Sequence, residues 1–109
     1  MIARTWHAQA QPEKADAYAA HFTGAVVPAL KALAGHRGAL LLRREIEGCV
    51  EFTALTLWES RSSIEAFAGE DISRAHIEPE GRAALSMYDD FASHYEVVFT
   101  SFDAASTYP

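Results

Sequence analysis

Two strand-like runs on either side of a short turn constrain the fold of this chain more than any other feature. Residues 39–46 and 49–58 are rich in leucine, β-branched and aromatic side chains, and Glu47-Gly48 between them suits a tight turn. We therefore predict an antiparallel hairpin. The second run places Val50, Phe52, Ala54 and Trp58 on one face and Leu55 and Leu57 on the other. Both faces of the hairpin are thus partly apolar.

The first elements follow from periodicity and from residues typical of helix boundaries. Alternation over residues 2–9 predicts a strand, and apolar spacing over residues 15–33 predicts a helix that begins near Pro12. Pro28 is expected to kink or end that helix, because its ring removes a backbone donor. Gly35 is expected to follow as the C-terminal stop.

The second half of the chain predicts two further helices and a final strand. Ser62 and Glu65 have the spacing of a capping box, so a helix is expected from there to Gly69. Another helix is expected to begin at Pro79. Its apolar side consists of Ala84, Leu85, Tyr88 and Phe91. Alternation over residues 94–102 predicts the last strand.

This order of elements predicts one α+β domain over residues 1–109. Strand, helix, strand, strand, helix, strand is the ferredoxin-like order, in which an antiparallel sheet has helices on one face. The other face has no element to cover it, yet every predicted strand has apolar side chains in both registers. An uncovered apolar face favours self-association, so we expect a homodimer.

Composition and charge disfavour several classes of protein. The chain has 9 basic and 15 acidic residues, and the resulting net charge of −6 disfavours nucleic-acid binding, which needs a basic surface. The same charge disfavours docking on anionic lipid. We find no membrane-length apolar run and no signal-like N-terminal region, so we expect a cytoplasmic protein without membrane association. A single cysteine, Cys49, excludes an internal disulfide framework.

Three short motifs in the chain are distinctive. They are Thr56-Leu57-Trp58-Glu59-Ser60 at a strand end, Ile64-Glu65-Ala66-Phe67 in a short helix with Ala75-His76 after it, and His94-Tyr95-Glu96-Val97 in the last strand. Together they resemble the antibiotic-biosynthesis-monooxygenase-like family. The resemblance covers nearly the whole chain in the order of its elements. It implies a ferredoxin-like fold assembled as a dimeric α+β barrel.

The resemblance implies two chemistries as alternatives. Some family members oxidise polycyclic aromatic molecules with molecular oxygen and no cofactor. Others bind haem on a histidine after the second helix and degrade it, and His76 is similar to that histidine in position. The haem-degrading members also have a tryptophan in the second helix and an asparagine in the first strand. This chain has Phe67 in the helix and Trp6 and His7 in the strand.

The first alternative assigns roles to particular residues. We expect a cofactor-independent monooxygenase of an aromatic or polyketide-like molecule, in which His76, or Tyr88 as second choice, removes a proton from the substrate. A pocket between helices and sheet is expected to bind a small apolar or aromatic ligand. Its walls are expected to include Trp58, Phe67, Phe22 and Trp6.

Other uses of such a pocket are open at this point. A non-catalytic small-ligand-binding dimer is the second hypothesis, and a haem-binding protein using His76 is the third. Histidines and carboxylates are too scattered for a metal site, and no glycine-rich phosphate loop is present, so no metal or nucleotide cofactor is expected. Among the other histidines, His7 and His94 lie on outer strands, and we expect His21 at the surface and His36 in a loop.

Overall fold

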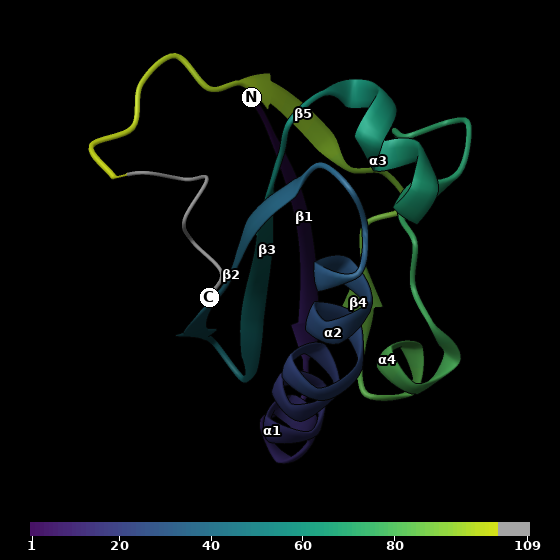
Figure 1. Ribbon diagram of the computed structural model, residues 1–109. Coiled ribbons are helices and arrows are strands. Elements are labelled where there is room, and N and C mark those ends of the chain that lie inside the picture. The colour runs from purple at the N-terminus through teal and green to yellow at the C-terminus, as the bar shows by residue number, and fades with distance from the viewer. Residues whose placement is uncertain (103–109) are drawn as a thin grey trace.

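The computed structural model describes residues 1–102 as a sheet with helices on one of its faces (Figure 1). The strands are β1 (Ile2–Ala10), β2 (His36–Ile46), β3 (Cys49–Trp58), β4 (Met87–Tyr88) and β5 (Ser93–Glu96). The helical segments are α1 (Pro12–His21), a π-helical turn (Phe22–Val26), α2 (Val27–Lys31), α3 (Arg61–Ala68) and α4 (Pro79–Ala83). Residues 103–109 of the predicted domain lie outside this described part. No helix within it is long and apolar enough to cross a membrane.

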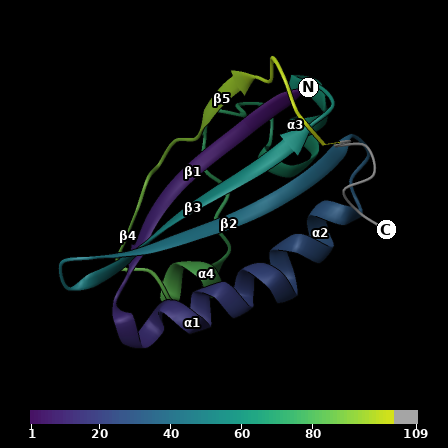
Figure 2. The same cartoon turned by 90° about the vertical axis from the view of Figure 1, so that its left-hand side faces the viewer.

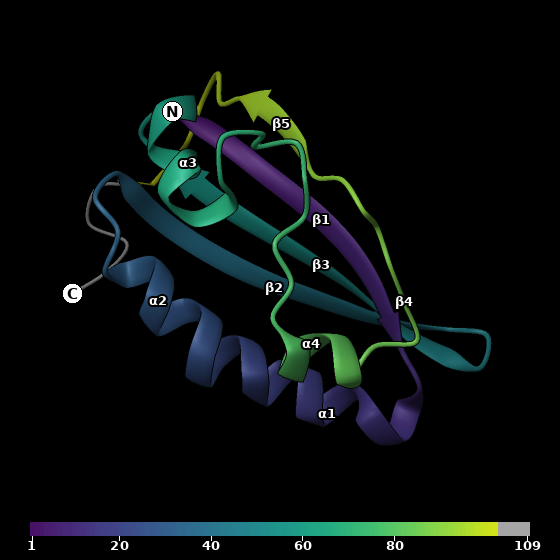
Figure 3. The same ribbon diagram turned by 90° about the vertical axis from the view of Figure 1, so that its right-hand side faces the viewer.

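The sheet confirms the predicted α+β, ferredoxin-like topology. Its strands are ordered β2-β3-β1-β4, and β5 also pairs with β1, all antiparallel. β4 pairs with Ala8 and Gln9 near the end of β1, and β5 pairs with residues 2–5 at its start. The two short strands together therefore take the place of the fourth strand. Figures 2 and 3 show α1, α2 and α4 along one face of this sheet.

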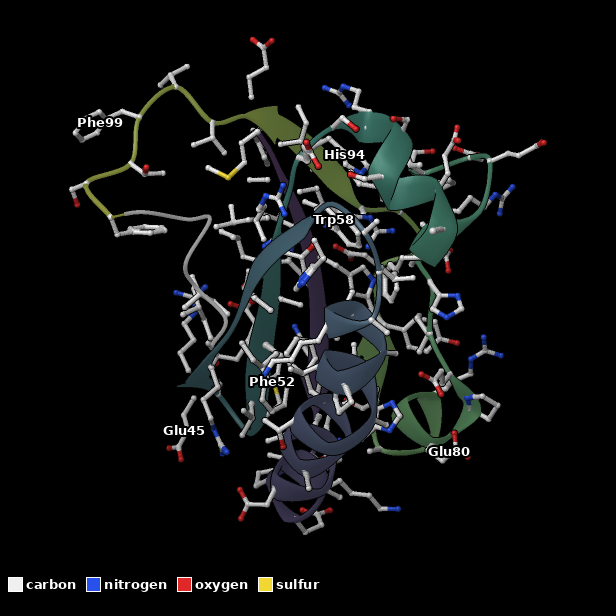
Figure 4. The ribbon with its side chains drawn as sticks, in the orientation of Figure 1. Glu45, Phe52, Trp58, Glu80, His94 and Phe99 are labelled. Atoms are coloured by element: carbon white, nitrogen blue, oxygen red, sulfur yellow. The ribbon has the colours of Figure 1, made fainter. Side chains whose placement is uncertain are left out.

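The core lies between the sheet and the helices and has two parts. The larger part joins β1 and β3 to α1, and its largest buried side chains are Trp6, Tyr18, Phe22 and Phe52. The smaller part joins the end of β3 to α2 and α3 through Leu30, Trp58 and Ile64. Figure 4 shows Phe52 and Trp58 toward opposite ends of β3. Alternate residues of each strand thus face the helices, as the periodicity predicted.

The opposite face of the sheet has exposed apolar side chains, and none of the described helices covers it. Leu40 and Leu42 of β2 are each 52% exposed, and Tyr95 of β5 is 56% exposed. Leu40 pairs with Leu55, and Tyr95 pairs with Ala3, so these side chains share one surface. We call this surface the outer face. It is the second apolar face that the hairpin residues predicted.

The first helix does not end at Pro28; the turn before it widens instead. Proline has no N–H, so one backbone bond of a regular α-helix cannot form there. Residues 22–26 adopt π-helical bonding, in which the Val27 N–H donates to the Phe22 carbonyl. The helix then continues to Lys31, and Figure 2 shows α1 and α2 as one continuous helical path.

The cap of α3 lies earlier than predicted. Ser60, not Ser62, is the N-cap, and its hydroxyl accepts a hydrogen bond from the Ser63 N–H at 3.3 Å. The Ser63 hydroxyl accepts one from the Ser60 N–H at 3.2 Å, which completes a capping box without Glu65. Several serines in a row offer the same donor and acceptor atoms, so spacing alone does not identify the cap.

The predicted helix through Tyr88 and Phe91 is wrong beyond Ala83. α4 ends there, and Met87 and Tyr88 form β4. The Ser86 N–H donates to the Gln9 carbonyl at 2.8 Å and starts this pairing. The free edge of β1 offers backbone partners over a long distance in sequence, and tertiary context of this kind overrides local helical spacing.

The last strand is also shorter than the predicted 94–102. β5 ends at Glu96 because β1, its partner, begins at Ile2; one further bond joins the Val97 N–H to the Met1 carbonyl at 3.0 Å. The following residues leave the sheet, and Figure 4 shows Phe99 pointing away from it.

Candidate functional site

A cavity lies between the inner face of the sheet and the helices. Its walls come from β1, β3, α1, the π-helical turn, α2, α3, α4 and the residues just before α4. Its volume is about 50 Å³, which is more than one water molecule needs. It is well below the roughly 300–1,000 Å³ of a typical small-molecule pocket. A ligand larger than a few atoms therefore requires the walls to move apart.

Four residues expected at the site line this cavity. Trp6 comes from β1, Phe22 from the π-helical turn, Phe67 from α3 and His76 from the segment before α4. The fold thus brings together residues that are 70 positions apart in sequence. Three of the four are aromatic rings, which suit a flat apolar ligand.

Tyr88 and Trp58 do not line the cavity. Of the pocket wall expected from Trp58, Phe67 and Tyr88, only Phe67 is in place. Trp58 is fully buried behind Phe67, with ring centroids 6.0 Å apart, and its indole N–H donates to the Thr56 hydroxyl at 2.8 Å. Tyr88 lies on β4 rather than on a helix, where it pairs with Ala8. The strand pairing that ended the predicted helix therefore also moved Tyr88 away from the cavity.

His76 lies at the mouth of the cavity. The residue is exposed, and its ring meets that of Phe67 edge to face at a centroid distance of 5.0 Å. An imidazole at this position is in contact with both solvent and the cavity. It is therefore placed to take a proton from a bound molecule and to pass it to water.

His21 is a second imidazole in the cavity wall, which sequence reasoning placed at the surface. It is half-buried at the end of α1, beside Tyr18 at a ring distance of 6.2 Å. Gly81 of α4 lies so close that a Cβ there would come within 3.0 Å of the His21 ring. The missing side chain of Gly81 thus makes room for this imidazole. His21 lies three residues after Tyr18, and this helical spacing was the sequence feature that could have placed it beside the buried Tyr18 ring.

Arg4 is a further wall residue that sequence reasoning missed. It is only 6% exposed, on the inner face of β1 between Ile2 and Trp6. Its guanidinium donates to the carbonyls of Arg74 at 2.8 Å and Ile72 at 3.4 Å. Burial lowers the pKa of Arg4 to about 10, so it keeps its charge at neutral pH. The alternation of residues 2–9 already placed this charge on the apolar face.

The Tyr18 hydroxyl in the wall is protonated at neutral pH. Burial raises the pKa of Tyr18 to about 12. The group can therefore donate a hydrogen bond to a ligand, but it is not suited to act as a base at pH 7.

The remaining histidines lie outside the cavity wall. His94 pairs with Arg4 across β5 and β1, and its pKa is lowered by burial, then by the charges of Arg4 and Arg61. His7 is on the outer face, 3.6 Å from the Asp89 carboxylate. The prediction that His36 lies in a loop is wrong. His36 is a buried residue of β2, and its ring lies 4.9 Å from that of Trp58.

The chemistry available to this site is that of an apolar cavity with one buried cation, the Glu78 carboxylate and two imidazoles. Within residues 1–102, no group of three or more histidine, cysteine or carboxylate side chains could hold a metal ion. The cavity can enclose an aromatic molecule, orient it by hydrogen bonds and exchange protons with it.

Comparison with known proteins gives a family and a set of similar structures. The family model described as antibiotic biosynthesis monooxygenase matches residues 1–79. No curated protein matches the chain significantly. A Bacillus cereus protein named for antibiotic biosynthesis monooxygenase has a similar structure, with a TM-score of 0.63 and 16% identity over 94% of this chain and 96% of that one.

Two Mycobacterium tuberculosis proteins are similar in structure as well. One has a TM-score of 0.61 and 16% identity over 93% of this chain and 98% of that one. The other is the haem degrader MhuD, solved with two haems in its active site, with a TM-score of 0.59 and 19% identity over 94% of this chain and 100% of that one. At these identities the likeness extends to the fold alone.

Proposed function

Since the chain belongs to the antibiotic biosynthesis monooxygenase family, we propose that it is a cofactor-independent monooxygenase of a small aromatic or polyketide-like molecule. The observation that supports this proposal is the cavity, in which Trp6, Phe22 and Phe67 provide aromatic walls and His76 and His21 provide two imidazoles. A substrate with an acidic C–H bond supplies its own electrons to oxygen, so the protein needs only to hold it and remove the proton.

The proposed reaction balances without a further reductant. His76 accepts a proton from a ring CH₂ group whose anion is conjugated with a carbonyl, and the resulting carbanion transfers electrons to molecular oxygen. One oxygen atom becomes a new carbonyl on that carbon. The other leaves as water with the two hydrogens that the carbon has lost. Since His76 is exposed at the cavity mouth, it can return its proton to the departing oxygen, directly or through solvent, before the next turnover.

Oxygen uptake tests this function. Anthrone is a suitable probe, because its CH₂ group is acidic and its oxidation by one O₂ yields anthraquinone and one water. We expect catalysed uptake with the unmodified protein, and a fall in turnover of about 10²–10⁴-fold for His76→Ala. Lys14→Ala, at an exposed position of α1 outside the cavity wall, is the control and should keep its activity. Turnover by His76→Ala equal to that of the unmodified protein would rule out His76 as the base.

Haem fits the described cavity poorly. The haem-degrading relative shares the fold, and His76 or His21 could in principle supply an imidazole. A haem is much larger than a molecule such as anthrone, however, so the walls of this cavity of about 50 Å³ would have to move much further apart to admit it. We therefore favour the smaller aromatic ligand. Addition of haem should give no Soret band characteristic of histidine ligation.

The proposed assembly is a homodimer that buries the outer face. Leu40, Leu42 and Tyr95 expose more than half of their surface there, which is costly for a protein that remains a monomer. The same face of a second copy offers a matching apolar surface, and a two-fold dimer uses one surface twice. A non-catalytic ligand-binding dimer would have the same assembly, and the oxygen-uptake measurement separates the two functions.

A further inference from the structure

The buried charge of Arg4 has only part of its bonding capacity satisfied. Its terminal nitrogen donates to the carbonyls of Arg74 and Ile72, and the guanidinium carbon lies 5.6 Å from the centre of the Phe67 ring. The Nε atom is buried and has no hydrogen-bond partner among the described residues. A guanidinium has five N–H donors, so several of them are available to another acceptor.

Among the described residues, no carboxylate forms an ion pair with Arg4. No carboxylate lies within 4.0 Å of its guanidinium. Glu78 also lines the cavity but does not pair with it. His94, its neighbour across the strands, cannot act as a counterion, because a histidine side chain is either neutral or positively charged.

A buried cation without a counterion is unfavourable, because leaving water costs it hydration that neutral carbonyls replace incompletely. The carbonyls of Arg74 and Ile72 hold the guanidinium in place at the cavity wall. A ligand that brings an anionic oxygen into the cavity would supply both the missing charge and an acceptor for the free donors. Hydrogen bonds between ionised partners are the strong ones.

We propose that Arg4 makes the cavity specific for aromatic molecules that carry an anionic oxygen, such as a carboxylate, phenolate or enolate. This inference rests on the proposed function in that it concerns the same cavity. It adds the chemical class of the ligand and the residue that selects it. Trp6 and Phe67 contact the flat apolar part of the ligand, and Arg4 binds the charged end.

Two small probes of nearly equal shape test the proposal. Benzoate and benzamide are both flat, and only benzoate carries a charge. We expect calorimetry to show benzoate binding about 10- to 100-fold more tightly than benzamide at pH 7, the range for a hydrogen bond to a charged group. Arg4→Met should abolish that preference and leave benzamide binding unchanged. Arg37→Met removes one positive charge outside the cavity and should keep the preference.

Equal affinities of the two probes for the unmodified protein would overturn the proposal, and so would a preference that survives in Arg4→Met. Absence of binding by both probes would overturn it as well. The comparison on the unmodified protein requires no variant, so it decides the matter even if Arg4→Met does not fold. Oxygen uptake with anthrone is measured independently. Turnover of anthrone together with equal probe affinities would leave the proposed function in place and reject the role of Arg4.

Discussion

His36 connects the stability of the fold to pH through a single imidazole. Its ring is buried against Trp58, and burial lowers the pKa of His36 to about 4, although a backbone hydrogen bond with Gly38 opposes the shift. In the unfolded chain the pKa of a histidine is about 6.5. Between these two pH values the unfolded chain binds more protons than the folded one, so stability decreases as the pH falls.

We therefore predict that the free energy of unfolding falls between about pH 6.5 and pH 4, with at most about 3 kcal/mol from His36. Urea denaturation at several pH values measures this. His36→Phe keeps a ring beside Trp58 and should make the decline shallower. His94, whose pKa is also lowered by burial, adds to the decline. A decline as steep in His36→Phe as in the unmodified protein would contradict the assignment.

At the residue scale, sequence reasoning found the aromatic walls more readily than the charged one. Trp6, Phe22 and Phe67 occupy regular apolar positions, and such positions face the core wherever the element lies. Arg4 occupies the same kind of position. A charged side chain there is either exposed at the edge of the sheet or buried with hydrogen-bond partners, and the alternation does not distinguish the two. Its partners are backbone carbonyls 68 and 70 residues away, and no local pattern indicates them.

The start of β2 and the start of α3 meet at a glycine. Gly35 has a φ of +86°, and a Cβ there would lie 2.5 Å from the Ser63 Cβ. The Glu59 N–H also donates to the Gly35 carbonyl at 2.7 Å. Gly48 in the hairpin turn has a similar φ of +74°, but a Cβ there would meet no atom within 4 Å. Both glycines therefore have a backbone conformation that strains other residues, but only Gly35 also lacks space for a side chain.

We predict that Gly35→Ala destabilises the protein more than Gly48→Ala does. The change at Gly48 costs only the left-handed backbone penalty, about 1–2 kcal/mol. The change at Gly35 adds a steric conflict with the capped end of α3, which has to move. Thermal unfolding of both variants measures the difference. Equal melting temperatures for the two variants would show that α3 shifts without cost.

At the scale of elements, local pattern predicted the long strands well and the last third of the chain poorly. The strand over residues 49–58 has the predicted limits, because its alternation and the glycine turn are both local signals. β4 and β5 are short and owe their place to the edge of β1. A two-residue strand has too few residues for a period, so only the tertiary pairing defines it.

The whole molecule is expected to be a dimer. An interface over the outer face would bury on the order of 2,000 Å² or more, as stable homodimers do. Leu40→Glu places a charge on the outer face and should give a monomer in light scattering at micromolar concentration, because an unpaired charge in a dry interface is costly. Phe91→Ser is the matched control, since Phe91 is also 56% exposed but contacts Arg74 instead. An unmodified protein that is monomeric at micromolar concentration would contradict this assembly.

The π-helical turn limits the deletions that the first helix can accept. Tyr18, Phe22, Val26 and Leu30 face the sheet and are spaced four residues apart. In a regular α-helix each such step rotates the side chain by about 40°, so the last residue would turn by about 120° relative to the first. The wide turn takes up part of this rotation, so one helix serves both parts of the core. Loss of a single residue between His21 and Leu30 would rotate one relative to the other by about 100° and move them to different sides of the helix.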